Sequence, residues 1–189
     1  MAVTLTAIPI ELVTELVNGW GTLPRQDDGR GDAPHRPVAD IAARLGLPAR
    51  LRAALTPELL ARAADRLHEV FSARDAEACA RRLTRVLADS GVRPVMEAGD
   101  GGGDGDSGTL RTAWRVDDAG HALVAVAAVT LRQYLADHGF ARIGICTGGH
   151  CADVYIDQSP GGRRRFCSVT CQNRARVAAF RSRRAAAAG

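Results

Sequence analysis

Four cysteines close to the C-terminus constrain the fold of this 189-residue chain more than any other feature. They form two close pairs, Cys-x4-Cys and Cys-x3-Cys, separated by fifteen residues: Cys146, Cys151, Cys167 and Cys171. A gap of hairpin length lets the chain fold back and bring the pairs together, as a tetrahedral Zn²⁺ site requires. Because four thiolates fill the coordination sphere, we expect one structural zinc ion and no catalytic metal.

The segment around these cysteines has too few large apolar side chains to fold by burial alone. A unit of about 40 residues is below the size that supports a hydrophobic core, and a structural zinc ion contributes on the order of 10 kcal/mol to such folds. His150 neighbours Cys151 and is the alternative ligand at that corner. The fifth cysteine, Cys79, lies on a helical apolar face and is interpreted as a buried small hydrophobe.

The residues between and after the two pairs predict a hairpin followed by a helix. Residues 154–157 favour a strand, residues 159–162 a turn, and residues 163–167 the returning strand, with Phe166 facing inward. Ser168 is a good N-cap for a helix over 169–184, in which Val177 and Phe180 are expected to face the hairpin. The order of knuckle, hairpin and helix is that of a treble-clef or zinc-ribbon-like finger.

Charge is distributed unevenly along the chain. Residues 1–157 hold 17 arginines and 21 acidic residues, whereas residues 158–189 hold eight arginines and no acidic residue. A strongly basic end favours binding to a polyanion, most simply nucleic acid. The alternatives are a solvated tail, or an arginine face that pairs with the acidic part of the chain.

Nine polar residues of the basic end are the candidate contacts to nucleic acid: Arg163, Arg164, Arg165, Asn173, Arg174, Arg176, Arg181, Arg183 and Arg184. Arginines on a helix can bind phosphates along a groove, and Asn and Arg can recognise base edges. Structural roles compete with these assignments, because Asn173 can bond the backbone within the finger and Arg174 can pair with Asp157. The remaining helix arginines can simply form a solvated face.

The rest of the chain predicts a mainly α fold. Helices are expected at about 9–20, with a stop at Asn18-Gly19, at 38–45 before Gly46, and after caps at Thr56, Asp75 and Asp118. Residues 21–37 favour a loop. Strand-like segments at 92–97 and 109–116 flank a glycine-rich stretch, 98–108, that lacks the Glu and flanking helices of a calcium loop. The expected organisation is a helical domain over 1–138, with a β-hairpin at about 92–116, and a finger over 141–185.

Several function classes find no support in the sequence. No signal peptide and no apolar run of membrane-spanning length are present, so a cytoplasmic location without membrane contact is expected, where clustered thiols favour metal over disulfide. The chain has no GxSxG, P-loop or HExxH motif and no open metal position. We therefore expect that it is not an enzyme.

The cysteine segment resembles the CGNR zinc finger. The resemblance is carried by all four cysteines, the Val154-Tyr-Ile-Asp157 strand, the Arg164-Arg-Phe-Cys-Ser168 run, and the arginine-rich helix after Cys171. Gln172 stands where the family signature has Gly. Family members commonly carry an N-terminal ABATE domain, to which residues 10–18 and the helical organisation up to 138 are similar.

This resemblance implies a stress-induced transcription regulator. The finger would then contact DNA, and the helical domain would sense a small-molecule effector or form a homodimer. The alternative is a zinc-braced protein-interaction module without direct DNA contact.

Overall fold

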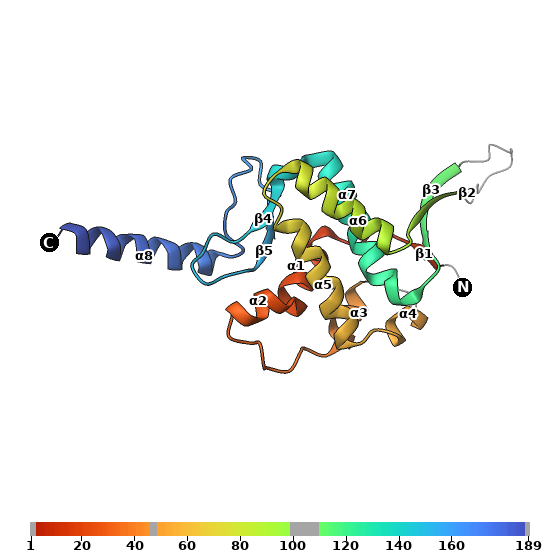
Figure 1. The fold of residues 1–189 in the computed structure, drawn as a ribbon, viewed down its shortest axis with the longest axis horizontal. Coiled ribbons are helices and arrows are strands. Elements are labelled where there is room, and N and C mark those ends of the chain that lie inside the picture. The colour runs from red at the N-terminus through yellow and green to blue at the C-terminus, as the bar shows by residue number, and fades with distance from the viewer. Residues whose placement is uncertain (1–2, 46–48, 99–109, 188–189) are drawn as a thin grey trace.

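The computed structural model describes residues 3–45, 49–98 and 110–187, and it is mainly α with two small antiparallel sheets (Figure 1). The glycine-rich segment expected at 98–108 lies outside the described residues except for Ala98, as does the stop at Gly46. The elements, in chain order, are β1 (Val3–Leu5), α1 (Ile10–Trp20), α2 (Thr22–Asp27), α3 (Val38–Arg44), α4 (Ala49–Ala53), α5 (Pro57–Phe71), α6 (Ala76–Asp89), β2 (Arg93–Ala98), β3 (Leu110–Val116), α7 (Ala122–His138), β4 (Ile143–Ile145), β5 (Val154–Ile156) and α8 (Val169–Ala187).

The segment from β1 to α7 forms a helical body whose core lies between α1, α5, α6 and α7. Helix α5 packs against all three of the others. Side chains with no exposed area come from three of these four helices, including Leu16 of α1, Leu67 of α5 and Leu131 of α7. No helix in the described ranges is long and apolar enough to cross a membrane.

Local capping explains where several helices begin. Thr56 accepts a hydrogen bond from Leu59 N at 3.3 Å, and Asp75 accepts one from Ala78 N at 2.7 Å, as their residue types predicted. Asp118 accepts from Gly120 N at 2.8 Å and precedes a short 3₁₀ turn that leads into α7. Gly139, with φ of +83°, ends α7 in a conformation that glycine adopts without strain.

The first sheet has the strand order β1-β3-β2, so the predicted hairpin of β2 and β3 is confirmed and gains a third strand. Strand β1 was not expected from the sequence. It pairs antiparallel with β3, Val3 opposite Val116 and Leu5 opposite Trp114. Val3 and Leu5 are buried and the intervening Thr4 is exposed, which is the alternation that a half-buried strand shows.

Two predictions for the body were wrong. Residues 21–37 contain α2, whose first residue, Thr22, donates from its N–H and its hydroxyl to the Asp65 carboxylate of α5 at 2.6 and 2.7 Å. This long-range anchor starts a helix in a segment whose composition favours a loop. The stop expected at Asn18-Gly19 is also absent, because α1 continues to Trp20, which is buried. Helix α4 was not foreseen.

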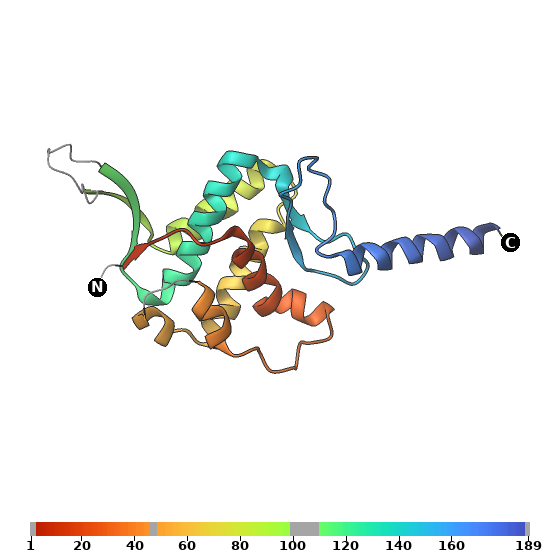
Figure 2. The ribbon, with the colours of Figure 1, turned by 180° about the vertical axis from the view of Figure 1, so that it is seen from behind.

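The second sheet, β4 and β5, packs on α1 and α5 at one end of the body, and α8 projects from it into solvent (Figures 1 and 2). Ile143 of β4 and Val154 and Ile156 of β5 belong to the same hydrophobic core as the body helices. We call β4, β5, their connecting loops and α8 the finger. Its hairpin is therefore joined to the body by apolar packing, whereas its helix is not.

Candidate metal centre and the arginine surface around it

The four cysteines converge from the turn between β4 and β5 and from the start of α8. Cys146 follows β4 and Cys151 precedes β5, so the first pair lies in the turn between these strands, which we call the knuckle (residues 146–153). Cys167 precedes α8, and Cys171 lies in its first turn. All four Sγ atoms lie within 4.8 Å of one another.

The sulfur geometry fits a tetrahedral zinc ion. The Sγ–Sγ distances are 3.7 Å between Cys151 and Cys167, 3.5 Å between Cys167 and Cys171, and 3.8 Å between Cys171 and Cys151. A tetrahedron with Zn–S bonds of about 2.3 Å has edges of about 3.8 Å. The finger thus carries a four-cysteine site for one structural Zn²⁺.

His150 is not part of this donor set. Its side chain is exposed and its backbone has φ of +55°, a left-handed turn conformation at the tip of the knuckle. Cys79, in contrast, is buried on α6 as predicted and lies outside the cluster. The four cysteines predicted as ligands are therefore the ones that cluster, and the alternative ligand His150 is not among them.

Burial disfavours ionisation of two of the four thiols, those of Cys151 and Cys167. It raises the pKa of Cys151 to about 12, and it raises the pKa of Cys167 as well. For Cys146 the effect of burial is outweighed by hydrogen bonds from the backbone N–H groups of Cys167 and Gly148, and its pKa is lowered. Zinc binding supplies the positive charge that stabilises all four thiolates, with release of protons.

Local hydrogen bonds hold the two ligand pairs in place. Cys171 N donates to the Ser168 hydroxyl at 3.2 Å, so the predicted N-cap is present and positions the last ligand. Thr147 donates from its N–H and its hydroxyl to Arg165 O, at 2.9 and 3.0 Å. This contact fastens the knuckle to the segment that leads into Cys167.

Three body helices hold the finger by side-chain hydrogen bonds. The Asn18 amide of α1 pairs with both backbone groups of Val154, at 2.8 and 3.0 Å. His68 Nε2 of α5 is 2.9 Å from Ala152 O, and the Tyr134 hydroxyl of α7 donates to Asp157 O at 3.0 Å. The knuckle and β5 are thus fixed relative to the body.

The returning strand predicted at 163–167 does not form, and β5 pairs with β4 instead. The physical reason lies at the outer edge of β5. The Asn18 amide occupies the backbone groups of Val154, and the Arg164 guanidinium donates to Ile156 O at 3.1 Å. With these groups satisfied by side chains, residues 163–166 pass by as an irregular segment, and the strand alternation expected for Arg163 to Arg165 does not apply.

Asp157 organises this irregular segment. Its buried carboxylate accepts from Ser159 N at 2.9 Å, from the Ser159 hydroxyl at 2.5 Å and from Arg164 N at 2.8 Å. The Ser159 hydroxyl is the largest of the contributions that lower the pKa of Asp157. Arg174 is exposed and forms no ion pair with Asp157, so that predicted alternative is wrong.

Arg164 differs from its neighbours in its contacts. Besides Ile156 O, its guanidinium donates to Phe166 O at 2.9 Å and to Cys167 O, and it lies over the Tyr155 ring. Arg164 is exposed, but its guanidinium braces the finger by bonding three of its backbone carbonyl groups. Arg142, which the sequence analysis did not select, donates to Ser159 O at 2.5 Å beside the same turn. Only its position next to the cysteine segment could have indicated it.

Most of the other candidate contacts are on open surface. Arg163, Arg165 and Asn173 are exposed, as are the helix arginines at 174, 176, 181, 183 and 184. Within the described ranges, none of these arginines takes part in an ion pair. Asn173 likewise shows no hydrogen bond to the finger backbone there.

Helix α8 buries only Cys171. Val177 and Phe180, which were predicted to face the hairpin, are 49% and 53% exposed. The prediction failed because α8 extends away from the hairpin and the body after its first turn, so its apolar face has no surface to pack against (Figures 1 and 2). Arg184 lies over the Phe180 ring and covers part of it.

A knuckle, a short hairpin and a helix that bring four cysteines together define a zinc finger. Residues 142–184 match the family described as the CGNR zinc finger, a segment that runs from just before β4 into α8. The match supports placing this segment in that zinc-finger family. No curated protein matches the chain.

Proposed function

We propose that this protein is a zinc-dependent, DNA-binding transcriptional regulator that acts in the cytoplasm by binding and not by catalysis. In this proposal α8 and the adjacent loop contact DNA, while the helical body, as an ABATE-like domain, senses an effector or forms a dimer. The observation that carries the proposal is a group of exposed finger arginines that form no ion pair with any residue the structure describes: Arg163, Arg165, Arg174, Arg176, Arg181, Arg183 and Arg184.

The arginines of the body provide the contrast. Eight of them form ion pairs with nearby carboxylates: Arg30, Arg44, Arg66, Arg74, Arg81, Arg93, Arg111 and Arg115. Seven carboxylates of the body are thus paired with nearby arginines, which makes these carboxylates unavailable to the arginines of the finger. A polyanion from outside is the partner that complements the finger.

The shape of α8 suits a DNA groove. Its 19 residues span about 28 Å at 1.5 Å per residue. Arg174 and Arg181 are seven residues apart and share one face, and Arg176 and Arg183 share another. Two rows of guanidinium groups on a helix of this width can reach phosphates on both sides of a major groove. Asn173, exposed near the start of the helix, is the candidate for a base contact.

A protein partner with an acidic surface is the second candidate. It is favoured by the exposed Val177 and Phe180, which would give an acidic protein an apolar contact that phosphates do not use. The two candidates differ in salt dependence, because DNA binding releases condensed counterions and a protein interface does so to a much smaller extent.

The test is fluorescence anisotropy of the zinc-loaded chain on mixed-sequence duplex DNA across a salt series, with a chelator-treated sample beside it. We expect binding that requires zinc and weakens steeply with salt. Replacing Arg176 and Arg181 by Ala should reduce the slope of log K against log salt by about 1 to 2.

Arg81→Ala with Arg93→Ala is the matched control, because it removes the same charge from residues already paired in the body. It should leave the slope unchanged. An equal loss in both double variants would mean that net charge alone governs binding. Absence of binding at low salt by the folded, zinc-loaded protein would reject the DNA proposal in favour of the protein partner.

A further inference from the structure

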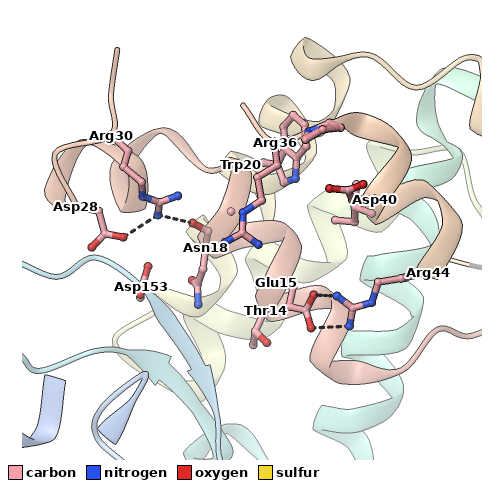
Figure 3. A pocket seen from close by; sticks show the side chains of 13 residues that line it. Thr14, Glu15, Asn18, Trp20, Asp28, Arg30, Arg36, Asp40, Arg44 and Asp153 are labelled. Carbon is pink, nitrogen blue, oxygen red and sulfur yellow. Dashed lines mark hydrogen bonds and ion pairs between the residues drawn. The ribbon is translucent and has the colours of Figure 1, made fainter. Parts of the chain in front are cut away.

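A cavity of about 560 Å³ lies where the body meets the finger. Its walls come from α1, the loop between α2 and α3, α3 itself, and the knuckle residue Asp153 (Figure 3). A volume in this range accommodates a small molecule, and junctions between structural units are common places for such sites. None of the four zinc-site cysteines lines this cavity.

The cavity is lined by charges of both signs, some of which are already neutralised. Arg30 pairs with Asp28 at 2.7 Å and also approaches Asn18 O, and Arg44 makes a two-pronged pair with Glu15. These pairs hold the walls in position. They leave fewer groups to recognise a ligand.

Three charged side chains in the lining have no ion-pair partner within the described residues: Arg36, Asp40 and Asp153. They come from the loop before α3, from α3 and from the knuckle. Unpaired charges of opposite sign around one cavity are the polar groups that would fix the orientation of a ligand.

We propose that this cavity binds a small zwitterion, a free amino acid or a short peptide. Its carboxylate would pair with Arg36, and its ammonium group would lie near Asp153, which is on the opposite side of the cavity from Asp40 (Figure 3). A ligand with a carboxylate alone would be repelled by the unpaired carboxylates of the cavity. A ligand with an ammonium group alone would be repelled by the Arg36 guanidinium. A nucleobase would need an aromatic side chain on which to stack. Trp20 does not offer one, because it is 3% exposed and its indole is already stacked on His35.

The position of the cavity connects such a ligand to the finger. Asn18 lines the cavity and holds Val154 by two hydrogen bonds, and Asp153 follows the zinc ligand Cys151 by two residues. A ligand would contact both groups at once and so stabilise the attachment of the finger to the body. The effect of the ligand on the finger rests on the sensing role in the proposed function. Binding of the ligand in the cavity does not depend on that role.

Gly19 offers a way to fill the cavity without damaging the fold. It lines the wall from within α1, and a Cβ built on it would meet nothing within 4 Å. Gln is a better helix former than Gly, so Gly19→Gln should project a side chain into the cavity without loss of helix stability. Gly19→Ala is the matched control, since it gains helix propensity and adds only a methyl group.

The experiment is isothermal titration of the zinc-loaded full chain with each of the twenty L-amino acids and with di- and trialanine, which separates the two sources of the zwitterion. Butyrate and butylamine present each charge alone. We expect saturable binding of at least one zwitterion, and a Kd raised by about 10- to 100-fold in Arg36→Met, as for loss of a charge-assisted hydrogen bond. Gly19→Gln should abolish this binding and Gly19→Ala should retain it.

Each other outcome overturns the proposal. If none of the zwitterions binds at millimolar concentration, the cavity does not recognise this class of ligand. Equal binding of butyrate or butylamine would reject recognition of both charges, and binding that persists in Gly19→Gln would place the site elsewhere. DNA binding measured on the same variants is a separate readout, so failure of the effector site and failure of the DNA proposal are distinguishable.

Discussion

Helices α7 and α8 are similar in length and opposite in surroundings. Eleven of the 17 residues of α7 are buried, whereas only Cys171 is buried among the 19 residues of α8. Helix α7 runs through the body core between α1, α5 and α6, and α8 extends into solvent (Figure 1). One chain thus contains a helix held by tertiary packing and a helix held almost entirely by its first turn.

This difference shows that two sources of stability act in separate parts of the protein. An isolated helix of this length is marginal in water, so α8 depends on the Ser168 cap, the Cys171 ligand and the high helix propensity of its Ala and Arg residues. The body needs none of these. Because α8 is exposed, it gains little stability from packing. The same exposure leaves its arginines available for the contact with DNA in the proposed function.

Removal of one zinc ligand should produce the largest difference in stability between α7 and α8. Cys167→Ser is expected to abolish stoichiometric zinc binding, because the site has no spare ligand and structural zinc contributes on the order of 10 kcal/mol. Hydrogen exchange should then show loss of protection in the knuckle, in residues 157–171 and in α8, with protection of α7 retained. Zinc content by mass spectrometry under native conditions measures the first effect.

The control for this variant is Cys79→Ala, which removes the thiol that lies outside the cluster. It should bind one zinc ion per chain, as should His150→Ala. Full zinc retention by Cys167→Ser would contradict the four-thiolate site, and loss of α7 protection in that variant would contradict the separation of the two sources of stability.

Matched deletions of apolar atoms should give unequal costs in the two helices. Leu131→Ala in α7 removes a side chain with no exposed area and is expected to lower the free energy of unfolding by about 2–5 kcal/mol. Val177→Ala in α8 removes a half-exposed side chain and should change it by no more than about 0.5 kcal/mol. Urea unfolding of the zinc-loaded variants measures both, and a large cost at Val177 would mean that α8 is packed in solution.

Asp157 lies at the border between the two regions and should show a smaller, pH-dependent effect. Asp157→Asn is expected to lower the free energy of unfolding by about 1–3 kcal/mol near pH 7, because hydrogen bonds from Ser159 and Arg164 to a buried carboxylate are weakened. The pKa of Asp157 in the folded state is lowered from its ordinary 3.8, first by the Ser159 hydroxyl.

The direction of the pH dependence follows from the lowered pKa of Asp157. Stabilisation by a carboxylate of lowered pKa is complete above the unfolded value and is lost as the pH falls through the folded one. The difference between Asp157→Asn and the unsubstituted protein should therefore be constant from pH 7 to about 5 and shrink below pH 4. Ser159→Ala should reduce the same difference. A gap that widens in acid would show that Asp157 is not held as a carboxylate.

Features that depend on neighbouring residues were predictable from the sequence. The caps Thr56, Asp75 and Ser168 are formed as expected, since a cap involves only the next three residues. The zinc ligands were predictable for the related reason that ligand spacing reflects the turns on which the ligands lie.

Features that depend on distant residues were not predictable. Helix α2 begins at an anchor supplied by Asp65, and β1 exists because β3 is available to pair with it. The strand expected at 163–167 is replaced because Asn18, more than 130 residues away from Val154, occupies the edge of β5. The apolar spacing of Val177 and Phe180 correctly described one face of a helix, but periodicity cannot say whether a surface exists for it to cover.

The attachment of β4 and β5 to the body core has a mechanical consequence. A finger on a flexible linker could turn freely, but here the start of α8 is tied through the four-cysteine site to the knuckle and β5, which Asn18, His68 and Tyr134 hold against the body. In a dimer formed through the bodies, the two α8 helices would therefore be held at a fixed separation and in a fixed relative direction. The distance between half-sites would then be set by the protein and not by the DNA sequence between them.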